Sequence, residues 1–117
     1  KVGCGAVAVN NTLAIVAQAH AVDMAENDYF SHDSLNGKSP FDRMSDAGYN
    51  YSTAGENIAA GYTTPSSVMT GWMNSDGHRA NILNCDFTEI GVGYYKLTND
   101  TGSVNYVYYW VQDFGRP

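Results

Sequence analysis

Positive charge is scarce in this sequence, and its scarcity excludes one large class of partners. The 117 residues include six Lys and Arg against twelve Asp and Glu, for a net charge of −6. The basic residues stand singly and form no stripe that could follow a phosphate backbone. We therefore expect no binding to nucleic acid.

Long hydrophobic runs are also missing. No apolar stretch approaches the roughly 20 residues that a helix needs to cross a bilayer, and Lys1 does not open a signal-peptide pattern. The chain begins as a mature or excised domain would. Because 44% of the residues are hydrophobic, there is enough apolar material for one core. We expect a single domain over residues 1–117 that is monomeric and does not span a membrane.

Cysteine occurs only twice, as Cys4 and Cys85, and in no metal-binding CxxC pattern. The pair could be two buried thiols, or one disulfide that ties the N-terminus to the segment after residue 83. Closing a loop of roughly 80 residues would stabilise the fold by about 4–5 kcal/mol in the chain-entropy model, less any strain. A disulfide would place the protein in an oxidising compartment.

Apolar periodicity predicts four helices. They are expected over 11–27, over 41–47 after Pro40, from Pro65 to Met73, and from an N-cap at Ser75 or Asp76 onward. His20 falls on the apolar stripe of the first helix, where a hydrogen-bonded core histidine is favoured over a functional one.

The C-terminal part of the chain predicts two strands. They are expected over 87–97 and 104–114, on either side of a turn at 99–102. The second strand carries apolar or aromatic residues on both faces, so we expect it in the middle of a sheet with helices on either side. Together with the preceding helices, this pattern indicates an α+β fold, a three-layer α-β-α sandwich with a mainly antiparallel sheet.

Three polar residues are candidates for a functional site. His32 falls in the polar segment 28–39, which has turn chemistry and is expected to be a loop. Glu56 is the only charge in the small-residue passage 51–61, so it must be exposed, paired or ligating. His78 is expected in the first turn of its helix, where the helix dipole disfavours the imidazolium form and leaves a neutral ring that can accept a hydrogen bond or ligate a metal.

Four motifs together resemble a known family. They are Tyr-Phe-Ser-His at 29–32, Gly-Glu-Asn-Ile-Ala at 55–59, Trp-Met-Asn-Ser-Asp-Gly-His-Arg-Ala-Asn-Ile-Leu at 72–83 and Ile-Gly-Val-Gly-Tyr at 90–94. In order and spacing they resemble the CAP superfamily of cysteine-rich secretory, antigen 5 and pathogenesis-related 1 proteins, above all its bacterial secreted SCP-like domains. The resemblance implies an α-β-α sandwich, an extracellular or cell-surface location, and a cavity lined by two histidines and two acidic residues.

By position, the resemblance assigns His32, Glu56 and His78 to that cavity. The second acidic residue is missing, because Ser75 stands at about its place; Asp76 or Glu89 could substitute for it. Bacterial relatives commonly pair an N-terminal cysteine with one after the Asn-Ile-Leu helix, which implies a Cys4–Cys85 disulfide.

Several functions fit these residues. The favoured one is a secreted binding or interaction module for an extracellular or cell-surface partner, with His32, Glu56 and His78 holding a divalent cation, zinc above others.

A second possibility is a metal-assisted or general-base hydrolase of the protease type. The sequence has neither a Gly-x-Ser-x-Gly elbow nor a His-Glu-x-x-His helix, and the serines that flank His32, Ser31 and Ser34, are weak candidates for a nucleophile. We therefore commit to no catalytic residue.

Two further readings stay open. The three polar residues could form a purely structural network. A lipid or sterol binder would need an exposed apolar groove, whereas the apolar residues of 65–73 and of the last strand are expected to be used in the core.

Overall fold

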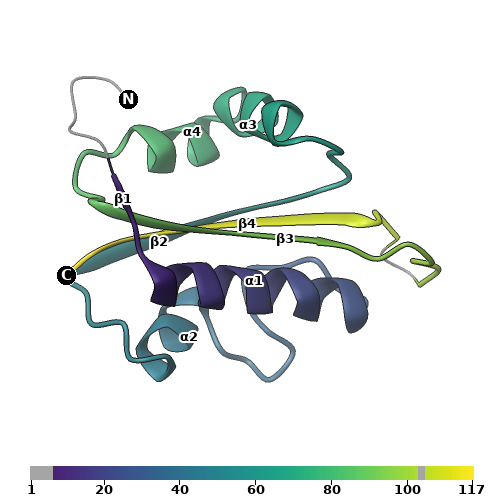
Figure 1. The fold of residues 1–117 in the computed structure, drawn as a ribbon, viewed down its shortest axis with the longest axis horizontal. Helices are drawn as coiled ribbons and strands as arrows, with labels where there is room; N and C mark the ends of the chain where they lie inside the picture. The colour runs from purple at the N-terminus through teal and green to yellow at the C-terminus, as the bar shows by residue number, and fades with distance from the viewer. Residues whose placement is uncertain (1–6, 103–104) are drawn as a thin grey trace.

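Helices and strands form three layers (Figure 1). In this computed structural model, which describes residues 7–102 and 105–117, α1 and α2 cover one face of a four-stranded sheet and α3 and α4 the other. In chain order the elements are β1 (Ala8–Val9), α1 (Asn11–Glu26), α2 (Pro40–Asp46), β2 (Thr53–Ala60), α3 (Pro65–Met73), α4 (Asp76–Leu83), β3 (Glu89–Lys96) and β4 (Tyr108–Arg116). The predicted α-β-α sandwich is confirmed.

The strand order is β1-β3-β4-β2, and β4 pairs antiparallel with both β2 and β3, whereas β1 pairs parallel with β3. The central place predicted for the last strand is therefore correct. Its predicted start is wrong, because the strand begins at Tyr108 and the preceding Val107 has a φ of +72°, which interrupts extended backbone. Val104, where the strand was expected to begin, lies outside the described residues.

Helix α1 lies directly on β3 because two glycines leave room for it. Asn10 caps the helix by accepting a hydrogen bond from the Leu13 amide at 3.0 Å. A Cβ on Gly91 would lie 2.1 Å from the Ala14 nitrogen, and one on Gly93 would lie 2.4 Å from the backbone of Ala17. Only glycine at these two positions permits the observed contact.

On the opposite face, α3 is held by Val68 and by Trp72, whose Nε1 donates to the Ile58 carbonyl of β2 at 3.1 Å. Met69 was predicted to be buried beside them, but its side chain is 37% exposed. The predicted N-cap of α4 lies at Ser75, although its side chain makes no capping hydrogen bond.

No described cysteine is free. Cys4 lies outside the described residues, so its pairing with Cys85 stays a prediction.

Candidate functional site

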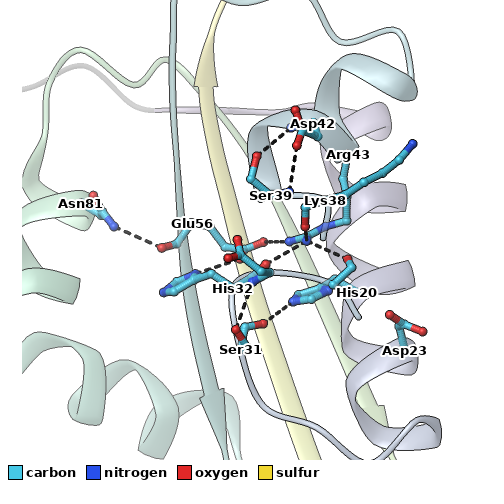
Figure 2. A network of polar contacts seen from close by, with 12 residues as sticks. His20, Asp23, Ser31, His32, Lys38, Ser39, Asp42, Arg43, Glu56 and Asn81 are labelled. Carbon is cyan, nitrogen blue, oxygen red and sulfur yellow. Dashed lines mark hydrogen bonds and ion pairs between the residues drawn. The ribbon is translucent and has the colours of Figure 1, made fainter. Parts of the chain in front are cut away.

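Strand β2 carries Glu56 into the protein interior, where its side chain is 1% exposed. Both carboxylate oxygens have partners (Figure 2). His32 Nδ1 lies 2.9 Å from Oε1, and Arg43 Nη2 donates to Oε2 at 2.9 Å. The sequence left three possibilities for this carboxylate, which could be exposed, paired or ligating. The structure shows that it is paired.

Arg43 also holds the loop that carries His32. Its Nη1 donates to the His32 carbonyl at 2.8 Å, to Ser34 Oγ at 3.0 Å and to the Lys38 carbonyl at 3.3 Å. The Arg43 side chain is only 13% exposed, so these bonds are largely shielded from water. The sequence showed only a single scattered basic residue here and gave no signal for this role.

Asp113 is a second buried carboxyl that the sequence analysis did not single out. It lies directly opposite Glu56 in the β2–β4 register and is fully buried. Among the described residues, neither oxygen of its carboxyl has a hydrogen-bond partner, and the Glu56 charge acts on it across the strand pair. Two neighbouring carboxyl groups that are both buried cannot easily both be ionised, so the pair holds one negative charge.

The two pKa values of this pair move apart. Burial, and then the Glu56 charge, raise the pKa of Asp113 well above its usual range. Burial alone would also raise the pKa of Glu56, but the interactions with His32 and Asp113 and the Arg43 charge outweigh it and lower that pKa. Asp113 is therefore the neutral acid and Glu56 the carboxylate.

His20 is the core histidine that its place on the helix predicts. It is 1% exposed, and its Nε2 lies 2.8 Å from the Ser31 carbonyl, which ties the loop before His32 to α1. Burial lowers the pKa of His20 and so favours the neutral ring.

Two asparagines join α4 to β2 on the other side of the site. Asn81 Nδ2 donates to the Glu56 carbonyl at 3.3 Å and to Asn57 Oδ1 at 2.9 Å, and Asn57 Nδ2 donates to the His78 carbonyl at 3.1 Å. His78 is half-buried. Burial, and then the charge of a protonated His32, lower the pKa of His78. The neutral His78 ring that was expected from the helix dipole is thus favoured in the structure by burial and by the His32 charge.

The accessory candidates do not join His32 and Glu56. Glu89 Oε1 accepts hydrogen bonds from Tyr49 Oη at 2.9 Å and from Asn10 Nδ2 at 3.3 Å, at the start of β3. Ser75 is half-buried at the N-cap of α4, and Asp76 is exposed in the first turn.

A cleft of about 390 Å³ opens beside these groups, between α2, α4 and the outer edge of β2. We call it the β2 cleft; its lining includes His32, Ser39, Phe41, Ala54, Glu56 and Asn81. Its volume lies within the roughly 300–1,000 Å³ of ordinary ligand sites. Its surface is mainly apolar and includes the Phe41 ring, which is 43% exposed, and it also carries polar groups such as His32, Ser39 and Asn81.

The predicted zinc shell does not fit this arrangement. Both oxygens of Glu56 are already bonded to His32 and Arg43. Among residues 7–102 and 105–117, no group of three or more His, Cys, Asp or Glu side chains is arranged to hold a metal ion. We therefore derive no chemistry through a metal at this site.

An apolar cavity of about 210 Å³ lies under α3 and α4, lined by Met69, Ile82, Phe87 and Phe114 among others. The apolar residues of α3 and β4 are thus not all used in the core, contrary to expectation. This volume is nevertheless below the roughly 300 Å³ at which ligand sites begin, so the cavity does not support a sterol site.

Within the described part of the chain, no helix has the length and apolar character of a membrane span.

The motifs and the fold agree with one family. The model of the cysteine-rich secretory protein family, CAP, matches residues 1–114. The chain belongs to this family. The uncharacterized protein YkwD of Bacillus subtilis is 46% identical over 114 residues, which are 97% of this chain and 41% of YkwD.

Solved CAP structures share the fold. An extracellular protein with an SCP domain from Bacillus anthracis is 36% identical and superposes with a TM-score of 0.82, over 97% of this chain and 35% of that protein. An outer surface protein from Borrelia burgdorferi is 25% identical with a TM-score of 0.86, over 98% of this chain and 80% of that one. This CAP chain therefore spans less than half the length of the Bacillus relatives that it matches.

Proposed function

We propose that this CAP domain is an extracellular binding module and that its ligand occupies the β2 cleft. The observation that carries the proposal is the position of His32. Its ring is held at Nδ1 by a buried carboxylate while its side chain is 50% exposed at the cleft. A polar group that is fixed from behind and open in front is prepared to bind without further ordering cost.

The extracellular location rests on the relatives, of which one is an extracellular and one an outer surface protein. The Cys4–Cys85 disulfide belongs to the same proposal. Thiol labelling of the unfolded, unreduced protein should find no reactive cysteine; two labelled thiols would refute the disulfide.

A hydrolase is less well supported than a binding module. Ser31 Oγ accepts a hydrogen bond from the Asp33 amide at 3.1 Å, and Ser34 Oγ accepts one from Arg43 at 3.0 Å. Neither hydroxyl bonds to the His32 ring among the contacts of the described residues. A base needs such a bond, or a water in its place, to activate a nucleophile.

The test is a fragment screen on isotope-labelled protein, followed by amide chemical shifts. We expect the hits to shift amides of residues 54–56 and Asn81 and to lose affinity in Asn81→Ala. The exposed Asp86→Asn serves as the control and should leave the affinity unchanged. Hits that map elsewhere, or that ignore both substitutions, would refute the cleft as the ligand site.

A further inference from the structure

Strand β2 is an edge of the sheet, so every second residue directs its backbone N–H and C=O away from β4. Gly61 shows which residues of β2 bond to β4, because its amide donates to the Tyr108 carbonyl at 2.8 Å. In this register the odd-numbered residues of β2 bond to β4, and the even-numbered ones face outward. The outward-facing residues are Ala54, Glu56, Ile58 and Ala60.

Side chains from the helices block part of this edge. The Glu56 carbonyl accepts from Asn81 Nδ2 at 3.3 Å, and the Ile58 carbonyl accepts from Trp72 Nε1 at 3.1 Å. No partner is found, among the hydrogen bonds of the described residues, for the N–H and C=O of Ala54 or for the N–H of Glu56. These three groups lie along the β2 cleft, which both residues line.

We propose that the β2 cleft binds an extended peptide, which adds as a strand to the edge of β2 at Ala54 and Glu56. This inference rests on the proposed function and names its ligand class. A peptide residue placed opposite Ala54 donates its N–H to the Ala54 carbonyl and accepts from the Ala54 N–H. A residue two places along accepts from the Glu56 N–H, so one short extended segment satisfies all three groups.

The same register sets the side-chain preference of the peptide. Ala54 packs against the core cluster that contains Leu13 and Met44, so its side chain points to the face of the sheet that α1 and α2 cover. A residue opposite Ala54 points to that same face, where Pro40 and the half-exposed Phe41 form the cleft wall. An apolar or aromatic side chain is expected at this peptide position.

The neighbouring peptide positions point toward α4. Gly55 faces that side and has no room for a side chain, because a Cβ there would lie 2.8 Å from the Phe87 ring. Asn81 is the polar group of the cleft on this side. The hydrogen bond from its side-chain amide to the Glu56 carbonyl, at 3.3 Å, is long for an N–H···O contact. Small or polar residues are expected at these positions.

The experiment selects short random peptides displayed on phage against the intact domain and then tests the best binder as a synthetic peptide. Methylating its backbone nitrogens one at a time should weaken binding roughly tenfold or more at the residue that faces Ala54, and much less at its immediate neighbours. This series leaves the protein unchanged, so it does not depend on the folding of any variant.

The matched protein variants are Ala54→Pro and Ala54→Gly. Proline removes the outward N–H and is tolerated on edge strands, so binding should fall roughly tenfold or more. Glycine keeps the N–H and should bind almost as wild type.

Each outcome decides a separate point. Binding that shifts cleft amides but survives both N-methylation and Ala54→Pro overturns strand addition and leaves the cleft as a ligand site. A library that yields no peptide above the level of an unrelated control protein overturns the peptide class. The fragment screen then decides by itself whether the cleft is a ligand site.

Discussion

Replacing Arg43 with methionine should strongly destabilise the domain, because it leaves the Glu56 carboxylate buried without its cation. The Glu56 side chain is 1% exposed and that of Arg43 is 13% exposed, so water cannot take over from the guanidinium. Removing one partner of a buried ion pair costs about 3–5 kcal/mol. With about 2.1 cal/mol/K of unfolding entropy per residue over 117 residues, this corresponds to a Tm lower by roughly 12–20 °C.

Circular dichroism during thermal and urea unfolding at neutral pH measures this loss. A second substitution, Glu56→Gln, removes the charge that Arg43→Met leaves unpaired. The double variant should therefore be more stable than the sum of the single effects predicts, by about 1–3 kcal/mol.

The pH dependence gives a further check with a definite sign. The pKa of Glu56 is lowered in the folded protein, in part by the Arg43 charge. Its contribution to stability is present above the unfolded pKa of about 4.3 and is lost as the pH falls through the lower folded value. The stability difference between wild type and Arg43→Met should therefore shrink as the solution becomes acidic.

Lys38→Met is the matched control. Lys38 forms an ion pair with Asp46, but the two side chains are 49% and 54% exposed. Water replaces such a pair readily, so no measurable change in Tm is expected. Equal effects of the Arg43 and Lys38 substitutions, or strict additivity in the double variant, would refute the reasoning.

Three further predictions follow from particular contacts. Asp113→Asn should gain stability relative to wild type as the pH rises above the unfolded pKa of about 3.9, by up to about 1.4 kcal/mol per pH unit, because the raised folded pKa of Asp113 penalises the wild type there. A stability difference in urea unfolding that does not change with pH would contradict this. Gly91→Ala should lower the free energy of unfolding by about 1–3 kcal/mol, because its Cβ would meet the α1 backbone at 2.1 Å. Gly77→Ala, whose Cβ would have nothing within 4 Å, should be neutral or stabilising. Similar Tm values for the two variants would argue against the close contact. Calorimetric titration of chelator-treated protein with micromolar zinc should show no saturable site that depends on His78, because both oxygens of Glu56 are already bonded. A saturable site that disappears in His78→Ala would restore the zinc hypothesis.

Local features of the sequence were sufficient to predict where most of the helices form. Asn10 caps α1, and Ser39 and Thr64 open capping boxes ahead of Pro40 and Pro65. These signals depend on residues three or four positions apart, which any helix brings together. The place of His20 in the core follows from the same periodicity.

The start of β4 and the burial of Met69 were not predictable in the same way. Tyr106 and Val107 have strand propensity, but the positive φ of Val107 interrupts the extended backbone before Tyr108. Met69 lies at helical spacing with Trp72, yet it is 37% exposed and borders the apolar cavity under α3 and α4. Periodicity identifies the side of a helix that can be buried and not how closely the neighbouring layers pack against it.

The sequence by itself determined the helices, the family motifs, and the presence of a charge at position 56 that had to be satisfied. Only the tertiary structure decided how that charge is satisfied. Arg43 reaches Glu56 from another element, and Asp113 faces it because β4 pairs with β2 in one register out of several. A shift of one residue would turn Asp113 to the opposite face of the sheet. Strand register depends on the packing of all three layers, and for this reason the buried carboxyl pair and the open edge at Ala54 became visible only in the folded chain.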